Sequence, residues 1–210
     1  MIGVVGGSGG VGASTFAAVL AWVAGSGVLI DLDPLGGGLD VLLGIEREPG
    51  ARWSGLRLDG GRLDPVLLAG GLPRWAGVPV LAVDLSPPPG VEPVLAAAAA
   101  GGPVVLDLPR AASPSRDAAA AACDVVLVLA EARVRALAAA RAVLSSLPGV
   151  PIGLLLRRGD VPRADVAALV GAEPIATVPA AVRGVDLSDG RVPRGLARVA
   201  AGVLDGVDGP

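Results

Sequence analysis

Residues 6–15 read GGSGGVGAST, with five glycines among them. They lie between the apolar run Ile2–Val5 and the segment Ser14–Ala24, in which apolar residues recur at helical spacing. Glycines allow successive backbone N–H groups to point toward one centre, and a following helix adds the positive end of its dipole. The stretch therefore predicts a strand, a phosphate-binding loop and a helix. A tight strand-to-helix turn is the alternative, although it would need fewer glycines.

Two kinds of anion-binding loop match these residues. Glycines at positions 7, 9 and 12 have the Gly-x-Gly-x-x-Gly spacing of a dinucleotide-binding loop, and Asp31 follows at the distance of a ribose-binding acid. In a P-loop alignment, Gly12, Ala13 and Ser14 occupy the Gly-Lys-Ser/Thr positions. Ser14 then offers a hydroxyl to Mg²⁺, and Ala13 stands in place of the lysine. The loop alone does not choose between the two.

Short apolar runs alternate with Ala-rich helical segments along the rest of the chain. This alternation predicts an α/β fold with a mostly parallel, seven-stranded sheet and helices on both faces. The predicted strands are nearly all apolar, as strands buried on both faces are, and comprise Ile2–Val5, Val28–Ile30, Val78–Val83, Val104–Leu106, Val125–Leu129, Ile152–Leu156 and Ile175–Val178. The predicted helices comprise Ser14–Ala24, Val91–Ala100, Arg116–Ala122, Arg133–Leu147, Pro162–Val170 and Pro193–Leu204.

The length of 210 residues fits a single domain over residues 1–210. Within it, residues 46–79 are rich in Gly, Arg and Trp and interrupt the alternation. We interpret them as an irregular insertion around two short helices. Its tryptophans, Trp53 and Trp75, either close the core or face a partner.

The composition excludes several kinds of chemistry. All 17 basic residues are arginine, and the chain contains no Lys, His, Tyr, Asn or Gln. Nucleophile pairs with His, imidazole metal sites, Schiff bases and phenolic acids are therefore absent. The net charge of −3 argues against a dominant nucleic-acid-binding surface, and no specific nucleic acid is expected.

The cellular setting follows from cysteine usage and hydropathy. Cys123 is the only cysteine, so it forms no intramolecular disulfide, and we expect it in the core. The longest apolar stretch, residues 15–30, is broken by Gly25 and Gly27 and is shorter than the ~20 residues that span a membrane. These features predict a cytoplasmic protein without an integral membrane segment.

Three further segments resemble the MinD/ParA family of deviant P-loop ATPases. Residues 31–34 (DLDP) and 37–44 (GGLDVLLG) resemble its second strand and switch I region. Residues 102–110 (GPVVLDLPR) resemble the Walker B strand and switch II of the CpaE/TadZ-like branch. With the loop, the Trp53 region and residues 192–196 (VPRGL), the chain is most similar to actinobacterial CpaE-like and septum site-determining proteins.

The resemblance extends over essentially the whole chain and implies a SIMIBI-class, MinD-like P-loop architecture. It implies that Ser14, Asp31 and Asp107 hold Mg²⁺, and that Asp33 is the catalytic residue beside the attacking water. Arg157 and Pro179 match adenine-side positions, although relatives often carry Asn where this chain has Arg157. The phosphates of ATP would contact Gly9, Gly10, Val11, Gly12, Ala13, Ser14 and Thr15. An N-terminal domain that is common in such relatives is expected to be absent.

Some assignments have rivals in the pattern. Asp84 ends a strand much as Asp107 does, but Pro109 follows Asp107 as it does in the family. Asp33 precedes a proline and fits an ordinary turn as well. Arg110 is placed to meet a partner or a phosphate.

Typical loops of the family carry two lysines, one that reaches across a dimer and one before the Ser/Thr. The corresponding residues here are Ser8 and Ala13, and no alternative alignment supplies a lysine to a chain that has none. One well-placed cation at a phosphoryl-transfer centre is worth roughly 10³–10⁵ in rate. We therefore expect ATP binding with weak or no hydrolysis.

The resemblance implies a positioning or regulatory protein for septum placement or for assembly of a pilus or secretion system. It implies a homodimer through the P-loop face, protein partners from that machinery, and peripheral recruitment to a pole, septum or membrane-bound assembly. Two alternatives remain at this point. One is an NAD(P)-binding Rossmann oxidoreductase, which would lack His, Tyr and Lys as proton donors. The other is an interaction scaffold that binds no nucleotide.

Overall fold

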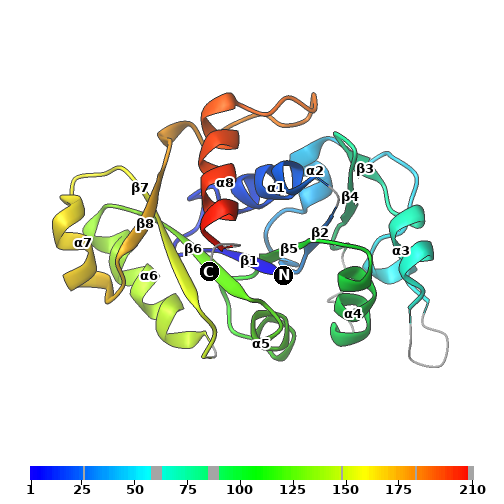
Figure 1. Ribbon diagram of the computed structural model, residues 1–210, viewed down its shortest axis with the longest axis horizontal. Coiled ribbons are helices and arrows are strands. Elements are labelled where there is room, and N and C mark those ends of the chain that lie inside the picture. The colour runs from blue at the N-terminus through cyan, green and yellow to red at the C-terminus, as the bar shows by residue number, and fades with distance from the viewer. Residues whose placement is uncertain (26, 58–62, 85–89, 148, 183, 208–210) are drawn as a thin grey trace.

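The computed structural model describes residues 1–25, 27–57, 63–84, 90–147, 149–182 and 184–207. In them an eight-stranded sheet has helices on both faces (Figure 1). In their order across the sheet, the strands are β3 (Arg74–Trp75), β4 (Val78–Leu81), β2 (Val28–Asp31), β5 (Val104–Leu108), β1 (Ile2–Gly6), β6 (Val125–Glu131), β7 (Ile152–Arg157) and β8 (Pro174–Val178). The helices are α1 (Ala13–Ala24), α2 (Leu39–Leu43), η1 (Trp53–Gly55), α3 (Pro65–Gly71), α4 (Glu92–Ala100), α5 (Pro114–Ala121), α6 (Val134–Ser146), α7 (Arg163–Val170), η2 (Ala180–Val182) and α8 (Arg194–Val207).

The sheet separates two hydrophobic layers. Helices α1, α2 and α8 cover one face, and α3 to α7 contribute to the core on the other (Figure 1). Successive strand residues face opposite layers, so Leu106 packs on the α3–α7 side and Val105 on the α1 side. This two-sided burial explains why the strands are continuous apolar runs without polar alternation.

The strand order distinguishes two families of nucleotide-binding sheet. In the dinucleotide-binding order 3-2-1-4-5-6, the first two strands are neighbours. Here β5 lies between β1 and β2, and it pairs in parallel with both. The pairing places Asp31 of β2 directly beside Asp107 of β5. Asp31, which would bind a ribose in the dinucleotide alternative, thus forms a pair of carboxylates with Asp107.

The prediction of seven strands is wrong by one, because β3 forms an eighth at the sheet edge. This strand runs antiparallel to β4, and Ala76 and Gly77 connect them with φ of 45° and 89°. Two residues with positive φ are typical of a type I′ hairpin turn. Strand β3 and the turn lie inside the predicted insertion, which also contains η1 and α3. Residues 58–62 of that insertion are outside the described part.

Two of the three tryptophans close the core. Trp53 and Trp75 are buried, and each satisfies its indole N–H with a carbonyl, of Asp31 at 2.7 Å and of Leu187 at 2.6 Å respectively. Both tryptophans therefore pack inside the domain, which settles the choice between core and partner surface. Cys123 is also buried, and burial raises the pKa of its thiol to about 12.

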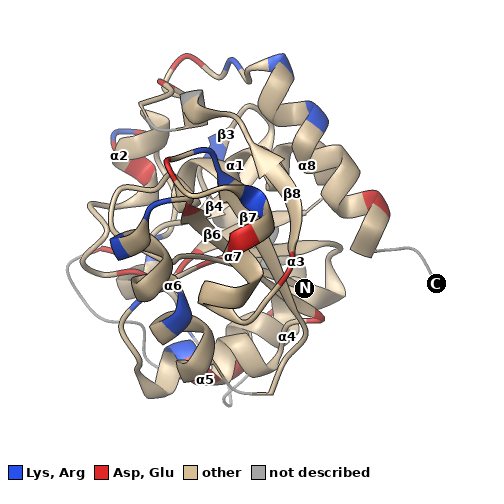
Figure 2. Ribbon diagram, turned by 90° about the vertical axis from the view of Figure 1, so that its left-hand side faces the viewer, with Lys and Arg blue, Asp and Glu red and all other residues tan. Residues whose placement is uncertain are grey.

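Helix α8 docks on the body of the domain. Its apolar face buries Leu196, Ala200 and Val203 in the same layer as α1, and the two helices lie side by side in Figure 1. No helix of the described residues has the length and hydropathy needed to cross a membrane. Acidic and basic positions are interspersed over the side shown in Figure 2.

Candidate functional site

The glycine-rich loop joins β1 to α1 as predicted. Gly10 and Gly12 have φ of 66° and 99°, and a Cβ on Gly12 would lie only 3.0 Å from the side chain of Val182. Glycine at position 12 is therefore required by both backbone conformation and space. At its start the loop is tied to β6, because the Gly7 N–H donates to the Leu129 carbonyl at 2.8 Å.

The loop presents backbone donors at the start of α1. The first hydrogen bond within the helix runs from the Phe16 N–H to the Gly12 carbonyl at 3.0 Å. The N–H groups of Ala13, Ser14 and Thr15 precede it and have no carbonyl one turn earlier in the helix. Together with the helix dipole, they form the kind of donor set that binds a phosphate.

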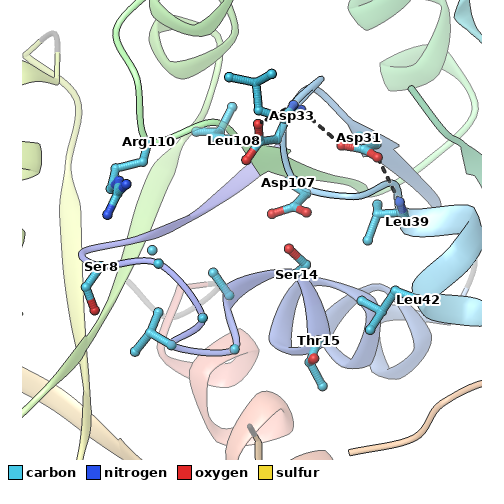
Figure 3. A pocket seen from close by; sticks show the side chains of 18 of the residues that line it. Ser8, Ser14, Thr15, Asp31, Asp33, Leu39, Leu42, Asp107, Leu108 and Arg110 are labelled. Atoms are coloured by element: carbon cyan, nitrogen blue, oxygen red, sulfur yellow. Dashed lines mark hydrogen bonds between the residues drawn. The ribbon is translucent and has the colours of Figure 1, made fainter. Parts of the chain in front are cut away.

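A cavity of about 810 Å³ opens beside the loop, so the loop has not collapsed on itself. Its volume is within the range of small-molecule sites. The walls come from β1, α1, the chain after β2, α2, the end of β5 and the chain near η2 (Figure 3). The described lining residues are Gly6, Ser8, Gly9, Gly10, Val11, Gly12, Ala13, Ser14, Thr15, Asp31, Asp33, Leu35, Gly36, Gly38, Leu39, Leu42, Asp107, Leu108, Arg110, Ala111, Val182 and Gly184.

Three carboxylates face this cavity from adjacent strand ends. Asp31 accepts hydrogen bonds from the N–H groups of Asp33 at 3.0 Å and Leu39 at 2.9 Å, which fix it between β2 and α2. Asp107 lies across from the Ser14 hydroxyl (Figure 3). Neither Asp31 nor Asp107 forms an ion pair with any residue in the described part of the chain.

Burial shifts the pKa of both carboxyl groups. Desolvation raises the pKa of Asp31 to about 6, against opposing backbone hydrogen bonds from Leu39 and Asp33. Desolvation, and then the neighbouring charge of Asp31, raise the pKa of Asp107 well above its usual range, and the Ser14 hydroxyl opposes this. A divalent cation between these groups would relieve both effects.

The donor set fits Mg²⁺ in its usual protein setting. Mg²⁺ prefers oxygen ligands and is held by one or two carboxylates together with phosphate and water. Ser14 and Asp107 supply such oxygens, and Asp31 lies beside Asp107 on the neighbouring strand. Within the described residues, no group of three or more Asp, Glu, Cys or His side chains forms a metal cage of its own. Two carboxylates and a hydroxyl suit an ion that also takes ligands from a phosphate and water.

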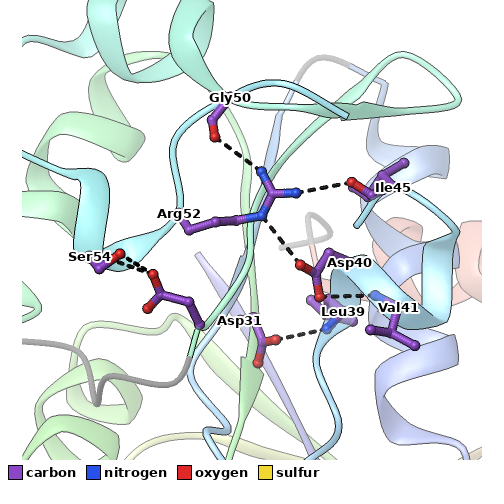
Figure 4. Close-up of polar contacts among 9 residues, drawn as sticks. Asp31, Leu39, Asp40, Val41, Ile45, Gly50, Arg52 and Ser54 are labelled. Carbon is purple, nitrogen blue, oxygen red and sulfur yellow. Dashed lines mark hydrogen bonds and ion pairs between the residues drawn. The ribbon is translucent and has the colours of Figure 1, made fainter. Parts of the chain in front are cut away.

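A polar network anchors the chain that follows β2. The guanidinium of Arg52 donates to the Asp40 carboxylate at 3.3 Å and to the carbonyls of Ile45 at 3.0 Å and Gly50 at 3.2 Å (Figure 4). This cluster holds α2, whose Leu39 binds Asp31. Asp84 accepts hydrogen bonds from the backbone N–H and the hydroxyl of Ser54, and it does not line the cavity. The rival Walker B residue therefore has a structural partner.

The two adenine-side residues stand apart from this cluster. Arg157 is buried at the end of β7, where its guanidinium pairs with Glu131 at 2.5 Å, and it does not line the cavity. Pro179 is also outside the lining, but its carbonyl accepts from the N–H of Val182, which is a lining residue. Their roles in base recognition stay predictions. The loop residues, Ser14, Asp31, Asp33 and Asp107 do meet at one cavity.

Other lining residues were not predicted as site residues from the sequence. Leu39 and Leu42 belong to α2, whose five residues are too few to show a helical period. Val182 reaches the loop from a segment more than 160 residues away in the chain. Only the packed structure brings such segments together.

No protein-family model matches the chain. Over 196 residues the chain is 39% identical to Rv3660c, an uncharacterized protein of Mycobacterium tuberculosis. The match covers 87% of this chain and 55% of the relative, so the chain spans about half the length of the curated relative that it matches.

Solved structures match over nearly the full chain. A ParA family ATPase from Chlorobium tepidum superposes with a TM-score of 0.73 at 16% identity, covering 96% of this chain and 95% of the other. The chain has the ParA/MinD fold. The septum site-determining protein MinD of Pyrococcus horikoshii, solved in complex with Mg-ADP, has a TM-score of 0.57 at 16% identity, covering 99% of this chain and 96% of that one. At identities this low, the superpositions show a shared fold and not a shared function.

Proposed function

We propose that this chain is a nucleotide-binding protein of the MinD/ParA type, which binds ATP with Mg²⁺ and hydrolyses it slowly or not at all. The observation that carries the proposal is the meeting of the glycine loop, Ser14 and the carboxylate pair Asp31 and Asp107 at one cavity. A protein with the same fold has been solved with Mg-ADP, which supports the choice of ligand.

In this proposal each group has a separate task. The N–H groups of residues 9–15 and the α1 dipole bind the phosphates. Ser14 and Asp107 hold Mg²⁺, with Asp31 in support, and the ion offsets the charge of the phosphate oxygens. Asp33, half-buried at the cavity, would orient water near the terminal phosphate.

Weak turnover follows from the missing ammonium groups. Ala13 lines the cavity as the first residue of α1, where a P-loop carries lysine. With no lysine in the chain, a smaller positive charge meets the phosphates as the transition state forms. The site therefore suits a nucleotide-dependent switch better than an efficient ATPase.

The biological role that we infer is that of a positioning or regulatory protein of the CpaE-like, septum site-determining branch. It would act in septum placement or in assembly of a pilus or secretion system, from the cytoplasm and by recruitment to a pole, septum or membrane-bound assembly. Dimerisation through the P-loop face is part of the proposal. Leu35, 90% exposed at the cavity rim, supports it as an apolar group that a second copy would cover.

Thermal unfolding with different ligands tests the proposal. A ligand at 100 times its Kd stabilises by ~2.7 kcal/mol, which for a domain of this size shifts the Tm by roughly 5–10 °C. We expect Mg²⁺-ATP to produce such a shift, ATP with EDTA to produce a smaller one, and NADH to produce none. A shift with NADH would favour the oxidoreductase alternative, whereas no shift with any nucleotide would favour the scaffold.

A further inference from the structure

The charges that line the cavity are unbalanced. Asp31, Asp33 and Asp107 contribute three carboxylates, and Arg110 is the only cationic side chain among the described lining residues. A nucleoside triphosphate would bring further negative charge into this space. Mg²⁺ offsets part of it, and the remainder needs a cation from the protein.

Arg110 is held in position by its backbone while its side chain stays free. It follows β5 by two residues, and its carbonyl accepts a hydrogen bond from Arg116 Nη1 at 3.4 Å. Arg116 is fully buried and also donates from Nη2 to the Ser146 carbonyl at 2.6 Å, so this support belongs to the core. The Arg110 guanidinium itself is exposed and has no hydrogen bond or ion pair to the described residues.

The free guanidinium is turned toward the glycine loop. Its Nη1 lies 3.9 Å from the position that a Cβ would take on Gly9. Figure 3 shows the side chain directed from the end of β5 toward the loop near Ser8, on the side of the cavity away from Ser14. A phosphate chain that begins at the α1 amides and extends along the loop would therefore reach Arg110 with its terminal group.

The two buried arginines that we have described, Arg116 and Arg157, are unavailable for this task. Arg157 is paired with Glu131, and Arg116 is occupied by Asp117 and Ser146. Arg110 alone among these three combines exposure, a cavity-lining position and a free fork of N–H donors. Such a fork matches the geometry of phosphate oxygens.

We propose that Arg110 contacts the terminal phosphate of a bound nucleoside triphosphate and makes the site prefer triphosphates to diphosphates. This inference rests on the proposed nucleotide binding. It assigns to an arginine of the same chain the charge that the absent lysines would supply. It also links the phosphate state of the ligand to residues 109–113, between β5 and α5, where a partner could detect it.

Calorimetric titration of Mg²⁺-ATP and Mg²⁺-ADP into wild type, Arg110→Ala and Arg110→Lys tests the assignment. We expect wild type to bind ATP roughly tenfold or more tightly than ADP. Arg110→Ala should weaken ATP binding about 10- to 100-fold and ADP binding by less than about threefold, because charge-assisted contacts to one phosphate are lost. The ATP affinity of Arg110→Lys should lie between those of wild type and Arg110→Ala. Arg198→Ala, which removes an exposed arginine from α8, is the matched control and should bind like wild type.

The outcomes separate this inference from the function on which it rests. If wild type binds neither nucleotide, nucleotide binding itself fails. If wild type binds ATP and Arg110→Ala keeps the same ratio of ATP to ADP affinity, only the role of Arg110 is overturned. Equal losses for both nucleotides would also overturn the assignment to the terminal phosphate. Circular dichroism melting of the ligand-free variants shows whether each is folded, and Arg110→Lys preserves the test if the alanine variant is not.

Discussion

Replacing Ala13 with lysine is expected to tighten Mg²⁺-ATP binding roughly ten- to hundredfold and to raise turnover at least tenfold. Ala13 is the first residue of α1 and lines the cavity, so an ammonium group there would join the backbone donors that face the phosphates. A tenfold gain corresponds to about 1.4 kcal/mol, a modest figure for a charge-assisted contact to phosphate. Titration calorimetry and steady-state phosphate release measure the two effects.

The control for this gain is a lysine introduced outside the cavity, which adds the same charge to the chain. Ala96 is exposed on α4, outside the cavity lining, and Ala96→Lys should leave binding and turnover unchanged. If Ala13→Lys behaves like Ala96→Lys, the loop does not cradle a phosphate. In that case it is a glycine-rich turn.

Asp107→Asn is expected to stabilise the ligand-free protein and to weaken the stabilisation by Mg²⁺-ATP. Burial raises the pKa of Asp31 from 3.8 to about 6 and that of Asp107 well above its usual range. The folded chain therefore keeps these protons to a higher pH than the unfolded chain, so the free energy of unfolding falls as the pH rises from about 4 through 6 and above. For Asp31 this loss amounts to about 3 kcal/mol.

Without its carboxylate, the empty protein should gain stability at alkaline pH. We expect Asp107→Asn to raise the free energy of unfolding at pH 8 and to flatten its decline between pH 5 and pH 8. Urea unfolding at the two pH values measures this change. Asp205→Asn, an exposed change on α8, should alter neither.

With ligand present, the same substitution should reduce the stabilisation that Mg²⁺ provides. Removing the carboxylate removes a Mg²⁺ ligand, so Asp107→Asn should abolish most of the difference in Tm between Mg²⁺-ATP and ATP with EDTA. A variant that is less stable when empty, yet responds to Mg²⁺ as wild type does, would make Asp107 a structural residue of β5 and not part of a metal site.

The core of the site was predictable from sequence because its parts lie in short, local patterns. The loop is a contiguous run of residues, and Asp31 and Asp107 each end an apolar strand. Since the carboxyl ends of parallel strands meet at one sheet edge, such acids are expected at the same edge as the loop. The alternation of strands and helices likewise predicted an α/β architecture with helices on both faces of the sheet.

The remainder depends on tertiary packing. The edge strand β3 has two residues, and its turn uses Ala76 with positive φ where Asn would be the usual signal. The pairing of Arg157 with Glu131 joins the adjacent ends of β6 and β7, which single-strand patterns do not reveal. Val182 meets the loop only because η2 folds back over α1.

Direct calorimetric titration of Mg²⁺-ATP into the wild-type chain decides whether a glycine loop without lysine holds a triphosphate. Saturable binding of one nucleotide per chain, with a Kd below about 1 mM and weakened by EDTA, is the predicted result. The absence of any binding heat at millimolar ATP, in protein shown to be folded, would contradict it.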